Sequence, residues 1–78
     1  MDQFELFENL IEVQTHTFYN HTIKQLKPVD AKAYIITQCD QLGLWLFIDS
    51  YNVSVKNLSL EILLRAKKII LCPVIVGG

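Results

Sequence analysis

The sequence predicts a small α+β fold, in which N-terminal helices precede a two- or three-stranded sheet with one crossover helix. Three observations support this fold class. Apolar and acidic side chains recur at helical spacing near the start, and two nearly continuous apolar runs occupy residues 44–48 and 69–76. Between these runs, residues 58–68 carry a single polar stripe, which is typical of a helix largely surrounded by protein. A length of 78 residues predicts one domain over residues 1–78.

The first predicted helix covers residues 2–13. Its acidic side chains suit the positive end of a helix dipole and lie on a different face from the apolar side chains. The apolar face consists of Phe4, Phe7, Leu10 and Ile11. Residues 14–27 contain strand-favouring residue types, but the spacing of their apolar side chains favours a second helix, which Pro28 would end.

A third helix is predicted over residues 31–42, with Asp30 as its N-terminal cap and Gly43 as its C-terminal stop. The side chains that this spacing turns inward are Ile35, Ile36, Cys39 and Leu42. Residues 44–49 then form a short buried strand, because an apolar run rich in Leu, Trp, Phe and Ile is bounded by turn residues.

The last part of the chain predicts two more strands around one helix. Val53 and Val55 alternate with polar residues, which indicates a short strand. Asn57 or Ser59 would cap the helix over residues 58–68, and residues 69–76 return as a buried strand with Pro73 at an edge or bulge. If strands 44–49 and 69–76 are parallel neighbours, the connection between them is a right-handed crossover.

Composition and charge restrict the class of partner. The formal net charge of −1 gives no support to a phosphate-driven nucleic-acid binder, whose footprint is a basic surface. The apolar runs are far shorter than the roughly 20 residues needed to span a bilayer, and the acidic start does not resemble a signal peptide. Cys39 and Cys72 lie in apolar neighbourhoods and favour free buried thiols. We therefore expect a cytoplasmic protein that binds no membrane.

No motif for catalysis, cofactor binding or metal binding is found in the sequence. His16 and His21 would lie about 140° apart on a helix, or on opposite faces of a strand, so no shared metal ion is expected. Asp49, Ser50 and Tyr51 follow an apolar strand, where catalytic residues often lie, but Asp and Ser are also what a turn requires. The sequence therefore predicts a protein that is not an enzyme and holds no cofactor or metal.

Residues 30–73 carry a pattern in which a glycine precedes an aspartate by six residues and alternating apolar residues follow. The residues of this pattern are Gly43, Asp49, Tyr51, Val53, Val55, Lys56, Asn57 and Pro73. The pattern resembles the Sm-like fold of the bacterial RNA chaperone Hfq, and the resemblance implies an RNA-binding ring. Arg65-Ala66 stands where that family has a Lys-His pair, and residues 58–68 predict a helix where the family has strands.

The sequence ends in Val74-Ile75-Val76-Gly77-Gly78. This ending resembles that of the ubiquitin-like sulfur carriers, in which the carboxylate of the terminal glycine is activated and thiolated. The resemblance implies that Gly78 would carry the sulfur and that the partner would be an adenylating enzyme. That family opens with a β-hairpin, where the present sequence predicts a helix.

The leading hypothesis is a small protein-interaction module that acts as a homo-oligomer. An apolar content of 51% is high for a chain that buries only roughly 60% of its surface on folding, and exposed apolar patches mark contact sites. Such a module would regulate, inhibit or neutralise a larger protein. The predicted contact residues are Trp45, Phe47 and Tyr51, together with the helix face formed by Phe4, Phe7 and Ile11.

Overall fold

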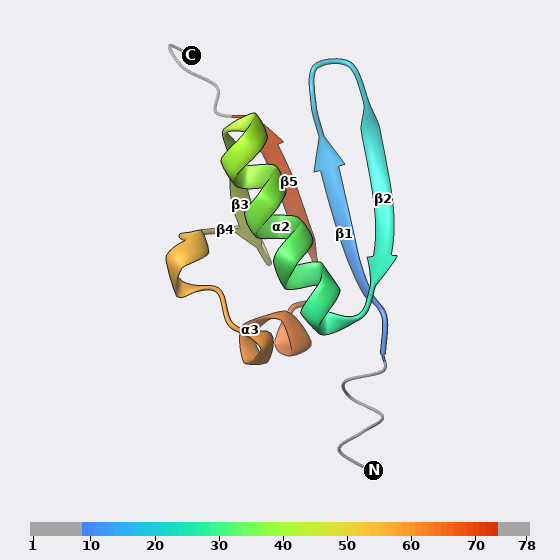
Figure 1. Cartoon of the computed structure of the whole chain (residues 1–78), viewed down its shortest axis with the longest axis vertical. Coiled ribbons are helices and arrows are strands. Elements are labelled where there is room, and N and C mark those ends of the chain that lie inside the picture. Colours follow the sequence, from blue (N-terminus) through green and yellow to red (C-terminus); the bar gives the residue numbers. More distant parts are fainter. Residues whose placement is uncertain (1–8, 74–78) are drawn as a thin grey trace.

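The computed structural model describes residues 9–73, which form one mixed five-stranded sheet, two α-helices and a short 3-10 helix (Figure 1). The hairpin strands come first and the long helix follows them. The elements in chain order are β1 (Ile11–His16), β2 (His21–Leu26), α2 (Pro28–Leu42), β3 (Leu44–Ile48), β4 (Tyr51–Val53), η1 (Val55–Asn57), α3 (Leu60–Arg65) and β5 (Ile69–Pro73).

The sheet has the strand order β2-β1-β5-β3-β4, so the last strand of the chain lies in the middle. β5 runs parallel to β1 and antiparallel to β3, while the β1–β2 and β3–β4 pairs are both antiparallel. The prediction of a two- or three-stranded sheet is therefore wrong. Strands β3 and β5 are neighbours, but they are antiparallel, so the right-handed crossover that parallel neighbours would have does not apply.

Residues 11–26 form a β-hairpin, so the helices predicted over residues 2–13 and 14–27 are wrong within the described part of the chain. The side chains of β1 alternate with a period of two: Val13 and Thr15 are buried, while Gln14 faces the other side. The turn is held by Thr17, whose Oγ1 accepts hydrogen bonds from the backbone N–H groups of Tyr19 and Asn20 at 3.3 and 2.9 Å. Pairing between the two strands therefore determines the structure of this segment, although a few of its apolar residues have helical spacing.

The segment before Pro28 ends there as expected, with β2 finishing at Leu26, and Pro28 is also the first residue of helix α2. No side chain caps its N-terminus, so the predicted cap at Asp30 is wrong; Asp30 lies in the first turn. The helix ends as predicted at Gly43, whose φ of 63° is a left-handed conformation that glycine adopts at low cost. Its buried side chains are Pro28, Ala31 and Ile35.

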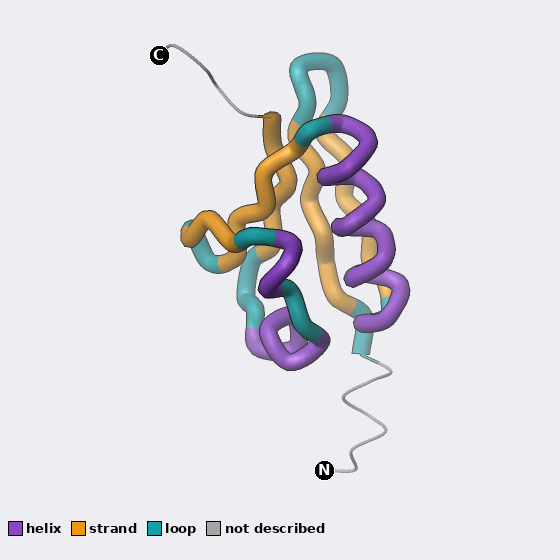
Figure 2. The backbone as a smooth tube through the Cα atoms, turned by 60° about the vertical axis from the view of Figure 1, so that its left-hand side comes forward, coloured by secondary structure: helices purple, strands orange, loops and turns teal. Residues whose placement is uncertain are grey.

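Helix α2 lies against one face of the sheet (Figure 2), and the core lies between the two. From the strands it takes the alternate side chains that point toward the helix, and Leu58 and Leu63 close it from the η1–α3 segment. Ile35 is buried here as predicted, but Ile36 and Leu42 are exposed and Cys39 only half-buried, so the inward face of α2 is narrower than the prediction. The buried apolar side chains are Val13, Ala31, Ile35, Leu44, Leu46, Ile48, Leu58, Leu63, Ile69 and Leu71.

The C-terminal elements follow the prediction with shifted ends. Strand β3 is confirmed, β4 ends at Val53, and Val55 belongs to η1 instead of a strand. Helix α3 is shorter than predicted and is capped by Ser59, whose hydroxyl accepts a hydrogen bond from Ile62 N at 3.2 Å. Pro73 is the last described residue of the central strand β5, not part of an edge strand.

The β3–β4 connection is a two-residue turn in which Asp49 and Ser50 both have positive φ, of 51° and 75°. Positive φ at both central residues is typical of a type I′ turn, which matches the twist of the two strands. Left-handed conformations are costly for a residue with a Cβ atom. The tight turn between β3 and β4 therefore requires a strained backbone at Ser50.

We expect replacement of Ser50 by glycine to raise the free energy of unfolding by about 0.5–1 kcal/mol, because glycine reaches this turn conformation without strain. Urea unfolding followed by circular dichroism measures the change. Ser54→Gly is the matched control, since Ser54 has a φ of −70° and its Oγ accepts a hydrogen bond from Lys56 N. The control should lose stability, and a loss at Ser50 as well would contradict the strained-turn interpretation.

Candidate interaction surface

The sheet presents a partly exposed apolar patch on the face opposite α2. Side chains alternate along a strand, and Leu44, Leu46 and Ile48 of β3 are buried toward the helix. The intervening side chains of β3 therefore point to the other face, and the same holds for β5, where Ile69 and Leu71 are the buried pair. We call the residues that result the open-face patch: Trp45, Phe47, Ile70 and Cys72.

The register of the sheet brings these four residues together. Trp45 pairs with Cys72 and Phe47 pairs with Ile70 across the β3–β5 ladder. The Trp45 and Phe47 rings lie with their centroids 6.4 Å apart, tilted by 39°, which is a favourable arrangement for two aromatic rings. Trp45 is 48% exposed, whereas the other three are half-buried. A large aromatic ring thus stands out from an apolar base.

Polar side chains of β1 border the open-face patch. Glu12, Gln14 and His16 share this face, and Gln14 lies beside Ile70 in the β1–β5 pairing. The Gln14 amide Nε2 donates to Glu12 Oε2 at 3.3 Å, and its Oε1 lies 3.4 Å from His16 Nε2. An apolar centre with a polar, solvent-exposed border is the usual anatomy of a protein–protein contact.

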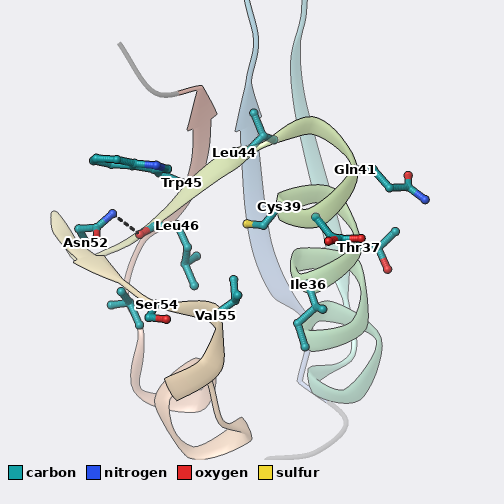
Figure 3. Close-up of a pocket in the computed structure, with 12 residues that line it drawn as sticks. Ile36, Thr37, Cys39, Gln41, Leu44, Trp45, Leu46, Asn52, Ser54 and Val55 are labelled. Atoms are coloured by element: carbon teal, nitrogen blue, oxygen red, sulfur yellow. Dashed lines mark hydrogen bonds between the residues drawn. The ribbon is translucent and has the colours of Figure 1, made fainter. Parts of the chain in front are cut away.

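A separate groove lies on the helix side of the sheet, between α2, β3 and the β4–η1 segment, with a volume of about 680 Å³ (Figure 3). Cys39 points from α2 into this groove, and burial raises the pKa of its thiol, so the thiol is neutral at pH 7. Trp45 points away from the helix in the same view. Trp45 also lines one end of the groove, so the groove and the open-face patch meet at this residue.

The structure brings together only two of the predicted contact residues. Trp45 and Phe47 are neighbours in the open-face patch, whereas Tyr51 is exposed at the edge strand and faces a shallow hollow near Ile62 and Arg65. Ile11 packs against the core at the start of β1, so its assignment to an exposed helix face is wrong. The other two residues of that predicted face, Phe4 and Phe7, lie outside the described residues.

Sequence reasoning did not place Ile70 and Cys72 beside Trp45. Alternation along the apolar run 69–73 places these two on one face, but only the pairing of β5 with β3 shows that this face is shared with Trp45. Cys72 and Cys39 are both free thiols on opposite sides of the sheet.

The polar residues after β3 have a structural role. Asp49 Oδ1 accepts hydrogen bonds from the backbone N–H groups of Lys67 and Lys68 at 2.9 and 2.8 Å, which ties the β3–β4 turn to the α3–β5 connection. Over residues 9–73 there is no cluster of three or more His, Cys, Asp or Glu side chains that could hold a metal ion. Within the same range no helix is both long and apolar enough to cross a membrane.

Comparison of the chain with protein-family models, with characterised protein sequences and with solved structures found no significant match. Its function is therefore inferred from the residues and surfaces described above.

Proposed function

We propose that this protein is a small interaction module that binds other proteins through the open-face patch and has no enzymatic activity of its own. The observation that carries the proposal is the position of Trp45, which is half-exposed in the apolar open-face patch, on the face of the sheet that lies away from α2. Aromatic residues in such positions dominate the binding energy of many interfaces. Binding of this kind suits a regulator, an inhibitor or a neutraliser of a larger protein.

The first partner to test is a second copy of this chain. The open-face patch and its polar border belong to a face formed by several strands, so two copies could pack face to face around a twofold axis. The formal net charge of −1 opposes such packing only weakly. The same balance of charge gives no support to nucleic acid as the main partner.

We expect the purified chain to self-associate and replacement of Trp45 by alanine to weaken the association by about 30-fold or more, since an aromatic anchor contributes roughly 2 kcal/mol or more. Light scattering after size exclusion, over a range of protein concentrations, measures both. Tyr51→Ala is the matched control, because Tyr51 is 75% exposed but lies outside the open-face patch.

Equal masses for the wild-type chain and both variants at every concentration would contradict self-association through the open-face patch. The ratio of nucleic-acid to protein absorbance on the same peak tests the Sm-like alternative. That alternative requires a large ring carrying nucleic acid, and it places strands over residues 58–68, where the structure has α3.

A second candidate function is that of a ubiquitin-like sulfur carrier, and the order of the elements favours it. The described chain opens with a β-hairpin, continues through a helix, and ends with a strand between β1 and β3. This order resembles that of ubiquitin-like proteins, since residues 11–26 form a hairpin where the sequence suggested helices. Gly77-Gly78 follows β5 in the sequence and lies outside the described residues.

In such a carrier, a partner enzyme would transfer AMP from ATP to the carboxylate at Gly78 and release pyrophosphate. A sulfur donor would then displace AMP and leave a thiocarboxylate. The test needs a chain whose carboxyl group is that of Gly78, incubated with ATP, a candidate adenylating enzyme and sulfide. Intact-mass spectrometry should show one oxygen replaced by sulfur, and no change in the chain lacking Gly78. An unchanged mass with every adenylating enzyme from the source cell would exclude the carrier function and leave the interaction module untouched.

A further inference from the structure

His16 and His21 face one another across the β1–β2 hairpin. The expectation that they lie on opposite faces assumed one continuous strand, but the chain reverses between them, and a reversal places residues five apart on paired strands. They are direct partners in the register, and their ring centroids are 4.0 Å apart with an interplanar angle of 22°. The two imidazoles therefore share the face of the sheet that carries the open-face patch.

We propose that His16 and His21 form a two-histidine site for a late divalent transition metal such as Ni²⁺, Cu²⁺ or Zn²⁺, with water completing the coordination. Histidine is the commonest metal ligand in proteins, and imidazole suits these ions. The inference does not rest on the proposed function: His16 also borders the open-face patch, but metal binding by the pair requires neither Trp45 nor Gly78.

The backbone around the pair favours chelation. Thr17 and Asn20, the pair next to the turn, share a backbone hydrogen bond of 2.8 Å. The adjacent pair, His16 and His21, is thus of the type without its own hydrogen bonds, which brings side chains closest together. Metal–nitrogen bonds of about 2.0–2.1 Å hold two nitrogens on one ion no more than about 4.2 Å apart. The centroids of the stacked rings are 4.0 Å apart, so the two side chains are within this reach, and each ring must tilt to direct one nitrogen at a shared ion.

Hydrogen bonds along β1 orient one of the ligands. Because the Gln14 amide nitrogen donates to Glu12, its carbonyl oxygen is the atom near His16 Nε2, at 3.4 Å. A carbonyl can only accept, so in the tautomer in which His16 Nε2–H donates to it the lone pair of Nδ1 is left for a metal. A ligand histidine commonly donates its other ring N–H to such a partner, which fixes its tautomer and orientation.

The charges near the pair do not oppose a cation. On this face His16 is followed along β1 by Gln14 and Glu12, and His21 is followed along β2 by Ile23 and Gln25. Lys24 belongs to the opposite face, where its ammonium group lies 4.9 Å from the Tyr34 ring centroid. The only charged side chain in these two rows is thus the carboxylate of Glu12.

Calorimetric titration of the untagged full chain with NiCl₂ at pH 7.5 tests the site. The wild-type chain should bind one equivalent, and His16→Asn and His21→Asn should each weaken binding at least tenfold, since a chelate needs both rings. Far-UV circular dichroism verifies that each variant keeps the fold of the wild-type chain.

The controls separate chelation from other modes of nickel binding. Cys72→Ser and Cys39→Ser should bind as the wild-type chain does, which excludes the thiols as ligands. If each histidine variant kept wild-type affinity, or if the loss followed the cysteine variants, the two-histidine site would be wrong. Two independent single-histidine sites would appear as halved stoichiometry without loss of affinity, and that result would also overturn the proposal.

Discussion

Replacement of Leu71 by alanine is expected to lower the free energy of unfolding by about 3–4 kcal/mol, the largest effect we predict for a single substitution. Leu71 is fully buried at the centre of β5, where it lies opposite Leu46 on one side and Thr15 on the other. Truncation removes apolar contacts and leaves a cavity under α2 that the surrounding strands cannot collapse to fill. A chain of 78 residues has a free energy of unfolding of only about 4–12 kcal/mol. Leu71→Ala would therefore remove a large part of the stability of the fold.

Ile70→Ala is the matched control for Leu71→Ala. The two residues are neighbours on the same strand, but Ile70 belongs to the open-face patch and is only half-buried. Urea unfolding should show a loss for Ile70→Ala well below that for Leu71→Ala. Equal losses would contradict the assignment of the core to the helix side of the sheet, while light scattering should report weakened self-association for Ile70→Ala alone.

The elements that the sequence predicts well are those with strong local signals at their ends. Gly43 ends α2 and Ser59 begins α3, and each acts through its own backbone or side chain. The apolar run between Gly43 and Asp49 forms β3 as expected. In each case the deciding interaction lies within a few residues in the chain, so periodicity and capping preferences are sufficient.

The hairpin could not be predicted in the same way, because its stability comes from pairs that are distant in the sequence. Phe18 and Leu26 fit a helical spacing, yet Phe18 is 80% exposed in the turn and Leu26 lies across from Ile11. The open-face patch has the same origin: Trp45 and Phe47 could be found from one strand, whereas Ile70 and Cys72 depend on the pairing of β5 with β3. The pairing of His16 with His21 likewise depends on the position of the turn between β1 and β2.

Replacement of Asp49 by alanine is expected to lower the free energy of unfolding by about 2 kcal/mol. One oxygen of its side chain accepts two backbone hydrogen bonds, from Lys67 and Lys68, and its own N–H donates to Lys68 O at 2.9 Å. Hydrogen bonds to a charged group contribute more than neutral ones. Aspartate also tolerates the left-handed backbone that a φ of 51° requires, whereas alanine is strained there. The lost hydrogen bonds and the backbone strain both weaken the attachment of the turn after β3 to the start of β5.

Asp49→Asn distinguishes hydrogen bonding from charge at this position. The asparagine Oδ1 can accept the same two bonds and asparagine tolerates the same backbone, so the expected loss is under about 1 kcal/mol. A loss equal to that of alanine would mean that the negative charge beside Lys67 and Lys68 contributes the stability. Hydrogen exchange of the Lys67 and Lys68 amides gives a local readout: it should accelerate strongly in Asp49→Ala and only slightly in Asp49→Asn. Wild-type exchange rates in Asp49→Ala would show that the carboxylate does not hold this connection, and Asp49 would then be free for another role at the end of β3.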